Sequence, residues 1–417
     1  MTLQRIIVML CLVIAGEAVF SLPFHVTRYF RPTFLEVFGW TNLELGKAQA
    51  IYGVVAMLAY FPGGPLADYF SARKLLSISL LSTSFGGLLM ATIPDQQTMA
   101  LCWGFWGLTS ILLFWAALIR ATRDWGGSDA QGQAFGLLDG GRGLFAAILA
   151  FACVAFFDFL MPEDVQNVSA IERRHALSMI IYTYTALTMA AAVFVWFAIP
   201  ESKQQEESQE KPPIVQTLLT LMKIPTLWLQ ALIVISAYVG YKGTDYFSLY
   251  AVDVYGMDEV KAAQVGAMAA WIRPIAALLA GLLADRLLSS RVVAGCFALL
   301  VLVYGAMGIL EPMPSAVWLL FAQIILICIA VYGLRGVYFA LFEEGGVPAA
   351  VTGSAAGIVS VIGYTPDIFV APCAGYLLDT WPGVQGHQYL LLFLMGFTCI
   401  GLLASIGFGV LAKKAKA

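Results

Sequence analysis

Charged residues are scarce in this sequence of 417 residues, because Asp, Glu, Lys and Arg together make up only 12% of it. A soluble domain carries about 25%. Hydrophobic residues make up 60%, so most of the chain must contact lipid rather than water. The net charge of −3 provides no basic field for nucleic acid. The composition therefore excludes a soluble enzyme, a disordered protein and a nucleic-acid-binding protein.

Motifs that carry reactive or metal-binding residues are also missing. The sequence contains no H-E-x-x-H, no G-x-S-x-G and no G-x-x-x-x-G-K-[ST] motif. The cysteines lie inside apolar runs at no spacing typical of a metal site, and their odd number does not indicate a disulfide framework. We therefore expect neither an enzyme nor an ATP-driven pump, and no cofactor or metal. The seven cysteines are Cys11, Cys102, Cys153, Cys296, Cys328, Cys373 and Cys399.

Long apolar runs dominate the sequence, each near the ~20 residues that a helix needs to cross the hydrocarbon core of a bilayer. The first run continues to Val26 and carries Glu17 at its centre, so we interpret it as a retained helix rather than a signal peptide. The alternating pattern of a membrane β-barrel is absent. We predict an all-α membrane protein with twelve transmembrane helices, at roughly 6–27, 48–67, 75–93, 98–119, 134–159, 177–199, 226–251, 262–284, 292–310, 316–341, 354–378 and 388–411.

Lys and Arg are distributed unevenly between the two sides of these spans. With the N-terminus inside, 13 fall in inner segments and 6 in outer segments. This bias predicts that both termini are cytoplasmic, and we expect the inner membrane of a bacterium. The longest polar inner segment begins at Glu201 and has the composition of a linker. It predicts an N-terminal six-helix bundle at 1–200, a cytoplasmic linker at 201–223 and a C-terminal six-helix bundle at 224–417.

The two halves resemble each other in sequence. The segment 64–68, Gly-Pro-Leu-Ala-Asp, recurs as Gly-Leu-Leu-Ala-Asp at 281–285, and 36–39 recurs at 253–256, both at an offset of 217 residues. Gly132 and Gly136 match Gly353 and Gly357 at an offset of 221. These matches predict two six-helix repeats around a central cavity, a plan typical of secondary transporters. Small residues four apart also favour close helix contacts, either sliding or static.

The segment 64–74, Gly-Pro-Leu-Ala-Asp-Tyr-Phe-Ser-Ala-Arg-Lys, resembles the signature loop of the major facilitator superfamily, G-x-L-a-D-r-x-G-r-[rk], although Ser71 replaces its glycine. The second copy, at 281–291, resembles it too. This resemblance implies a secondary transporter, and its loop residues imply a gating role for Asp68, Arg73, Asp285 and Arg286. A solvated charge at a helix end is the alternative for Asp68.

A weaker similarity connects the chain to the organophosphate/phosphate antiporter and sugar-phosphate permease branch of that superfamily. It depends on Arg28 and Tyr29 after the first span, and on Lys242-Gly243-x-Asp245 in the seventh.

Ionisable residues inside the predicted spans are the main functional candidates. Each costs about 2.5–3.5 kcal/mol on insertion scales, so they should face protein or water and pair with one another. Four are acidic and four are basic, which fits pairing. The eight are Glu17, Asp139, Arg142, Lys242, Asp245, Arg273, Arg335 and Asp367.

The basic residues are candidates for binding an anion. Arg273 and Arg335 have no acidic residue within one helical turn, and a guanidinium matches carboxylate, phosphate or sulfonate. The alternative is a salt bridge to an acid on another helix. Asp139 with Arg142, and Lys242 with Asp245, are spaced to pair on one helix face. The predicted substrate-binding residues are Arg273, Arg335, Lys242, Asp245, Tyr238, Tyr241 and Arg142.

Glu17, Asp367 and Asp139 are the candidates for proton coupling, because a carboxylate in a membrane interior can take up and release a proton. A permanent partnership with an arginine is the alternative. We interpret the three histidines, His25, His175 and His387, as interfacial residues on the outer side.

Together these patterns predict a monomeric secondary active transporter in the lipid bilayer. It moves a small organic anion (phosphorylated, sulfonated or carboxylated) by alternating access and is coupled to protons. An anion exchanger without proton coupling and a ligand sensor that does not transport are the alternatives. No nucleic acid partner is expected.

Overall fold

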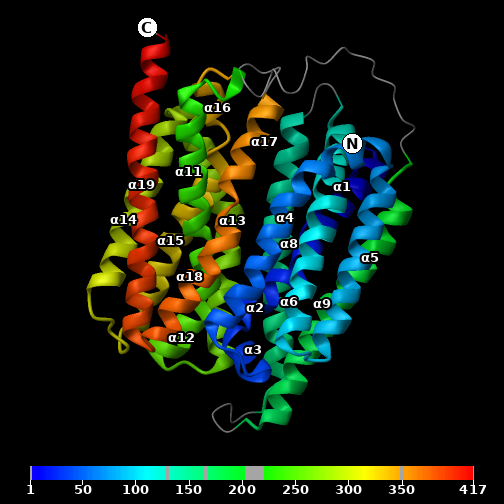
Figure 1. The fold of residues 1–417 in the computed structure, drawn as a ribbon, viewed down its shortest axis with the longest axis vertical. Coiled ribbons are helices and arrows are strands. Elements are labelled where there is room, and N and C mark those ends of the chain that lie inside the picture. The colour runs from blue at the N-terminus through cyan, green and yellow to red at the C-terminus, as the bar shows by residue number, and fades with distance from the viewer. Residues whose placement is uncertain (1, 128–130, 163–167, 202–219, 348–351, 417) are drawn as a thin grey trace. The chain divides into compact units, whose positions relative to one another are not determined.

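A computed structural model of the chain consists mainly of α-helices (Figure 1). It describes residues 2–127, 131–162, 168–201, 220–347 and 352–416, and within these ranges there is no β-strand. The side chains at 68, 131–132, 352–354 and 415–416 are outside this description. The architecture agrees with the predicted all-α fold.

The helices of the N-terminal part include two π-helical segments, here called η1 and η2. The elements are α1 (Leu3–Phe20), η1 (Ser21–His25), α2 (Val26–Tyr29), α3 (Arg31–Phe38), α4 (Asn42–Tyr69), α5 (Ala72–Ala91), α6 (Gln96–Gly107), η2 (Leu108–Trp115), α7 (Ala116–Gly126), α8 (Gln131–Leu160) and α9 (Ala170–Ala198).

The C-terminal part contains one 3-10 turn, η4, in its first span. Its elements are α11 (Pro225–Lys242), η4 (Gly243–Tyr246), α12 (Phe247–Tyr255), α13 (Glu259–Arg286), α14 (Ser289–Ile309), α15 (Val317–Val337), α16 (Leu341–Glu344), α17 (Thr352–Gly363), α18 (Pro366–Thr380) and α19 (Val384–Lys416).

Eleven helices in the described ranges are long and apolar enough to cross a membrane. They coincide with eleven of the twelve predicted spans. The remaining span, 226–251, is divided by the turn at Gly243 into α11 and α12. The span 354–378 is also interrupted before Asp367, where Pro366 cannot continue a regular helix, because α17 ends at Gly363 and α18 begins at Pro366.

Contacts divide the chain into two compact units. The first unit contains Met1–Gln204, Asp245–Trp271 and Asp367–Asp379, and the second contains Gln205–Thr244, Ile272–Pro366 and Thr380–Ala417. The boundary at Gln204 falls in the predicted linker 201–223, of which residues 202–219 lie outside the described residues. The first unit therefore takes residues from both sequence halves, whereas the second takes none from the N-terminal half.

Helix ends of the first unit reproduce the internal repeat. α3 ends at Gly39 with φ of 65°, and α12 ends at Gly256 with φ of 64°. Glycine is the residue that adopts this left-handed conformation without strain. These two positions are 217 residues apart, so the sequence repeat corresponds to a repeated backbone turn.

The π-helical segments of the first unit have local causes. Pro23 lies within η1 and has no N–H to donate, which removes one bond from the helix ladder. In η2, Ser110 Oγ donates to the carbonyl of Trp106 at 2.6 Å, and Ser79 Oγ donates to that of Thr109 at 2.8 Å. The buried Trp103 donates its indole N–H to the Pro23 carbonyl at 3.2 Å. Side chains thus satisfy carbonyls where the α-helical pattern is interrupted.

The second unit is built around α11, α14, α15, α17 and α19, which pack against one another. Buried Tyr304 of α14 donates its hydroxyl to the carbonyl of Gly240 at 3.0 Å, near the end of α11. Gln230 of α11 donates to the carbonyl of Tyr338 at 2.9 Å, just after α15. These bonds hold α11 against α14 and against the end of α15.

Close helix contact occurs at different glycines from those predicted. A Cβ added at Gly136, Gly140 or Gly357 would meet no described atom within 4 Å, so none of these glycines lies at a close helix contact within its own unit. In the first unit, α4 instead approaches α18. A Cβ at Gly46 would overlap the Ala371 carbonyl oxygen, and one at Gly53 would lie 2.6 Å from the backbone of Asp367. The contact depends on tertiary position, which the G-x-x-x-G spacing did not indicate.

Candidate functional site

Two charged side chains and a histidine meet inside the first unit. Glu17 of α1 forms an ion pair with Arg142 of α8, with 3.5 Å between Oε2 and Nε, and its other oxygen lies 3.2 Å from His25 Nε2. The Glu17 and His25 side chains are 4% and 3% exposed, and that of Arg142 is 12% exposed. We call these three residues the buried triad.

Both π-helical segments contribute to the surroundings of the buried triad. His25 is the last residue of η1, and Trp115 is the last residue of η2. The guanidinium of Arg142 lies over the rings of Phe20 and Trp115, at 5.7 and 5.8 Å from their centroids. The His25 ring is 5.4 Å from the ring of Tyr29. π-Helical segments are frequent at functional sites because they displace side chains from the regular helix positions.

His25 was missed by the sequence analysis, which placed it at the membrane interface. In the structure this histidine is 2% exposed and paired with Glu17, so it joins the candidate site residues. The two residues are eight positions apart, beyond the i, i+3 and i, i+4 spacings considered. Pro23 between them was the available signal, since a proline inside a span predicts a local distortion.

Arg335 occupies a different environment in the second unit. It lies in the last turn of α15, where the helix dipole favours a cation. Its guanidinium carbon is 4.0 Å from the ring centroid of Tyr241 and 5.9 Å from that of Tyr238. The phenols of Tyr338 and Tyr364 are also within electrostatic reach. We call these four tyrosines the tyrosine cage.

The tyrosine cage is held together by its own contacts. The Tyr238 ring is 5.6 Å from that of Tyr241 and 4.9 Å from that of Tyr364. The Tyr338 and Tyr364 hydroxyls are 3.5 Å apart. Among the residues that the structure describes, no carboxylate forms an ion pair with Arg335. The arrangement can therefore supply a guanidinium fork and several phenolic hydroxyls to a ligand with an anionic group and a carbon skeleton.

Lys242, predicted to pair with Asp245, is the last residue of α11, and Asp245 lies in the turn η4 that follows. Both are buried, at 4% and 7% exposed. Asp245 accepts from Arg28 Nε at 2.5 Å, and Ser248 Oγ donates to the Arg28 carbonyl at 3.0 Å. Arg28 and Asp245 are themselves 217 residues apart, so equivalent positions of the repeat form an ion pair within the first unit.

The remaining intramembrane candidates are placed as follows. Asp367 is half-buried at the start of α18 and lies within electrostatic reach of the buried Tyr52. Asp139 is exposed on α8, and Arg273 is half-buried on α13, which continues through Pro274. The structure thus groups Glu17 with Arg142, and Arg335 with Tyr238 and Tyr241.

Of the four predicted gating residues, Arg73 makes a defined contact. It forms an ion pair with Glu201 at 2.7 Å, and Lys74 reaches the same carboxylate at 3.1 Å. Asp285 and Arg286 are exposed at the end of α13. The side chain of Asp68 lies outside the described residues.

A further set of polar contacts in the first unit joins residues of the two sequence halves. Arg173 of α9 bridges Glu36 at 2.5 Å and Glu259 at 2.6 Å. Asp379 accepts from the backbone N–H groups of Asn42 at 3.1 Å and Leu43 at 2.7 Å. Carboxylates are favourable at a helix N-terminus, and these two amides begin α4. We call these contacts and the Arg28–Asp245 ion pair the inter-half contacts.

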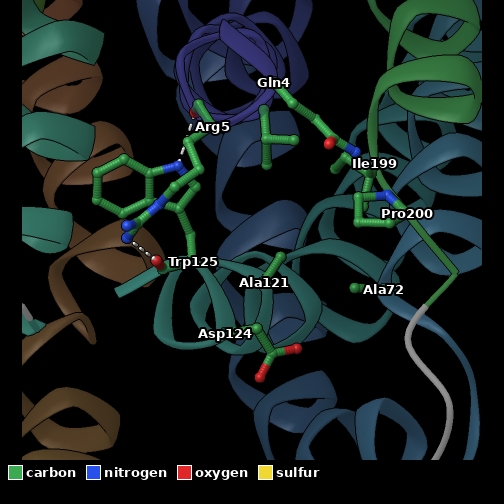
Figure 2. Close-up of a pocket in the computed structure, with 9 residues that line it drawn as sticks. Gln4, Arg5, Ala72, Ala121, Asp124, Trp125, Ile199 and Pro200 are labelled. Carbon is green, nitrogen blue, oxygen red and sulfur yellow. Dashed lines mark hydrogen bonds between the residues drawn. The ribbon is translucent and has the colours of Figure 1, made fainter. Parts of the chain in front are cut away.

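A pocket of about 230 Å³ opens at the beginning of α1 (Figure 2). Figure 2 shows Arg5 and Trp125 joined by two hydrogen bonds, with Ile199 and Pro200 on the other side. Arg5 donates to the Trp125 carbonyl at 2.8 Å, and Trp125 donates to the Arg5 carbonyl at 2.7 Å. Since Arg5 and Glu17 are twelve residues apart on α1, the pocket is about 18 Å along the helix from the buried triad. We therefore do not assign the pocket to the substrate.

Comparison with known proteins defines the class. The family model described as "Major Facilitator Superfamily" matches residues 8–365, so the chain belongs to the major facilitator superfamily. This confirms the family predicted from the signature loops and the fold of twelve helices in two repeats. It also confirms that the chain is a membrane transporter and not an enzyme.

Two of the similar curated proteins are inner membrane proteins of Escherichia coli. The inner membrane protein YqcE of Escherichia coli is 28% identical over 382 residues, covering 90% of this chain and 87% of that protein. The inner membrane protein YihN of the same organism is 25% identical over 404 residues, covering 95% and 93%. The "Probable nitrate/nitrite antiporter NarK1" of Thermus thermophilus is 22% identical over 391 residues, covering 86% and 82%.

Solved structures support the fold. A bacterial homologue of the human lysosomal transporter Spinster, inward-facing and unoccupied, has a TM-score of 0.75 and 15% identity, covering 99% of this chain and 98% of the other. The nucleoside transporter NupG has a TM-score of 0.69 and 14% identity, covering 98% and 99%. The chain is therefore an integral membrane protein with the fold of a secondary transporter.

Proposed function

We propose that this transporter moves a small organic anion, phosphorylated, sulfonated or carboxylated, by alternating access and in symport with protons. The observation that carries the proposal is Arg335 in the tyrosine cage. A cation that forms no ion pair within the described part of the chain, surrounded by hydroxyl donors, is complementary to an anionic ligand. Lys242, Arg273 and Arg142 supply further positive charge, and Asp245 completes the proposed substrate-binding set.

Aromatic rings favour an organic anion over a bare inorganic one. The faces of Tyr238 and Tyr241 present apolar surface beside the guanidinium of Arg335. Such rings contact a carbon skeleton, while their hydroxyls bind its polar groups. The relative NarK1 is named for nitrate and nitrite, which are anions too. This supports the charge of the proposed substrate, and the word antiporter in that name favours the exchanger as the second candidate.

Proton coupling is proposed for Glu17, Asp367 and Asp139. Carboxylates within the membrane are costly and mark proton pathways in many transporters. Glu17 is the most buried of the three, and its charge is balanced by Arg142. A bound anion can compete with Glu17 for that arginine, which couples the two ligands.

Alternating access is proposed from the inter-half contacts. Arg28–Asp245, Arg173–Glu259 and the α4 amides on Asp379 connect residues of the two six-helix halves, proposed at 1–200 and 224–417 with a linker at 201–223. These contacts have to separate in a conformation that opens on their side. Asp68, Arg73, Asp285 and Arg286 are proposed to act likewise on the other side.

The proposed setting is the inner membrane of a bacterium, with a monomer whose two termini are cytoplasmic. The positive-inside distribution supports this orientation. Two similar proteins, YqcE and YihN, carry "inner membrane protein" in their names.

Proteoliposomes that contain the purified protein test the proposal. A sugar phosphate, an alkyl sulfonate and a hydroxycarboxylate are added outside in turn, while internal pH and uptake of the labelled compound are followed. Symport predicts uptake accompanied by internal acidification. Exchange against internal compound without a pH change would favour the exchanger. Binding of a compound without uptake and without a pH change would favour a ligand sensor that does not transport.

A further inference from the structure

We propose that Arg31 captures the anion: its guanidinium binds the acidic group of the substrate when the first unit opens on the side of the inter-half contacts. This inference rests on the proposed function, from which it takes the anionic substrate and alternating access, and it adds a residue outside the proposed substrate-binding set. The observation that carries it is a guanidinium that is 0% exposed, although its two terminal nitrogens form no hydrogen bond with any described atom.

The Arg31 side chain has two described partners, and neither is a carboxylate. Its Nε donates to Asn42 Oδ1 at 3.0 Å, and its guanidinium carbon lies 4.3 Å from the ring centroid of Tyr246. Among the residues that the structure describes, no carboxylate forms an ion pair with Arg31, and no acceptor takes the N–H groups of Nη1 and Nη2. These N–H groups form the end of the fork that binds a carboxylate, sulfonate or phosphate through two oxygens.

The backbone at Arg31 adds positive potential and does not compensate the charge of the side chain. Arg31 is the first residue of α3, where the helix dipole is positive. Arg335 differs in this respect, because it lies in the last turn of α15, where the dipole favours a cation. An amide oxygen and an aromatic ring offset only part of the cost of burying a guanidinium. Arg31 is therefore in an unfavourable environment, which a bound anion would relieve.

The contacts around Arg31 show how an anion would reach it. Tyr246, which covers the guanidinium, is the neighbour of Asp245 in η4. Asp245 forms an ion pair with Arg28, which is one of the inter-half contacts. Separation of that contact would also move Tyr246 away from Arg31 and expose the guanidinium on the predicted outer side. Asn42 belongs to the same sequence half as Arg31, so it would stay in place and orient the fork.

Uptake from each side of the membrane tests the inference. Right-side-out and inside-out vesicles are prepared from bacterial cells that make the wild type or Arg31→Gln, and vesicles from cells without the protein provide the blank. The probes are labelled glucose 6-phosphate, ethanesulfonate and lactate. Glutamine retains an amide donor but has no charge and no fork. Arg174→Gln is the matched control, because Arg174 is an exposed arginine of the same unit on the predicted outer side.

We expect R31Q to raise the KM for uptake into right-side-out vesicles about tenfold or more. In inside-out vesicles its KM should differ from that of the wild type by less than about twofold, and R174Q should match the wild type in both. An unchanged KM of R31Q in right-side-out vesicles overturns the inference, and so does an equal rise in both orientations. Absence of wild-type uptake above the blank contradicts the proposed function itself.

Thermal unfolding of the purified proteins without anion distinguishes capture from a structural role, and it does not depend on transport. R31Q should be at least as stable as the wild type, because the substitution removes a buried charge that has no carboxylate partner. A lower unfolding temperature of R31Q would mean that Asn42 and Tyr246 satisfy the guanidinium, which overturns the inference.

A second variant, Arg31→Lys, retains the charge but lacks the fork. Its KM in right-side-out vesicles should lie between those of the wild type and R31Q. A wild-type KM in R31K would overturn the proposed contact through two oxygens.

Discussion

Arg142 and Arg335 carry the same charge, yet the protein surrounds them differently. Arg142, in the first unit, shares Glu17 with His25 and lies over two aromatic rings. Arg335, in the second unit, lies against phenol rings and has no ion pair with any described carboxylate. The first arginine thus has an exchangeable internal counter-charge, whereas the second is arranged to receive one from a ligand.

The two surroundings stabilise a guanidinium charge by different amounts of free energy. Removing one partner of a buried ion pair costs about 3–5 kcal/mol. A cation–π contact contributes about 0.5–2 kcal/mol, and the C-terminus of a helix about 0.3–1 kcal/mol. Rings and a helix end therefore compensate a half-buried guanidinium only in part. A bound anion supplies the remaining stabilisation of this charge. We therefore assign the strongest anion contact to Arg335.

The largest expected effect is that of Arg335→Gln. Loss of a bidentate, charge-assisted interaction should weaken anion binding about 100-fold or more. Equilibrium binding of a labelled anion to the purified protein measures it. Arg335→Lys retains the charge without the fork and should be intermediate.

Arg291→Gln is the matched control for this loss, because Arg291 is an exposed arginine of the same unit at the start of α14. It should bind like the wild type. Equal binding by R335Q and R291Q would remove the distinction between the two arginines.

The next effect concerns stability in the first unit. Arg142→Gln leaves Glu17 buried without its arginine, which should cost about 3–5 kcal/mol. Adding Glu17→Gln should recover most of that loss, because no unbalanced charge remains. Thermal unfolding of the two single variants and the double variant in detergent measures the coupling. Simply additive losses would show that the 3.5 Å ion pair has no energetic significance.

A smaller effect is expected for the ring beside Arg335. Tyr241→Ala removes the ring face that is proposed to contact the carbon skeleton of the anion beside the guanidinium, 4.0 Å from its centroid, and should weaken anion binding about fivefold, or about 1 kcal/mol. Tyr241→Phe retains the ring and should lose less than Tyr241→Ala. The reverse order would mean that the hydroxyl, and not the ring, supports the site.

The smallest effect on stability is predicted for Glu201, whose ion pairs with Arg73 and Lys74 are exposed. A hydrogen bond from Lys74, together with the charges of Arg73 and Lys74, holds the pKa of Glu201 below its ordinary value of 4.5. The contact therefore adds stability above about pH 4.5, and this contribution is lost as the pH falls through the lowered value. It should also weaken with salt.

Thermal unfolding of Glu201→Gln and wild type checks this sign. A slight difference should exist near neutral pH in low salt and disappear in acid. A difference that grows as the pH falls would contradict the assignment.

Much of the fold was predictable because length and hydropathy identify membrane helices in a sequence. The twelve spans, the break before Asp367 and the superfamily follow from local patterns and two loop copies. The repeat extends further than the sequence indicated, since Gly39 and Gly256 share a backbone turn and Arg28 pairs with Asp245 at the same offset. A repeat in the sequence does not show which of the repeated positions contact each other in the fold.

The candidate site was less predictable because its contacts cross between helices. Arg335 was identified from the lack of a nearby acid, but its neighbours Tyr238 and Tyr241 come from α11, nearly one hundred residues earlier. The role of His25 depends on the π-helical segment around Pro23, a distortion that hydropathy does not predict. Spacing along one helix therefore identified charges, and only tertiary structure identified their partners.

The most direct test records internal pH and labelled anion uptake simultaneously in proteoliposomes containing wild type, R335Q or R291Q. We predict that the wild type and R291Q move both anion and protons, and that R335Q moves neither. Undiminished movement of both by R335Q would contradict the assignment of Arg335 as the anion-binding residue.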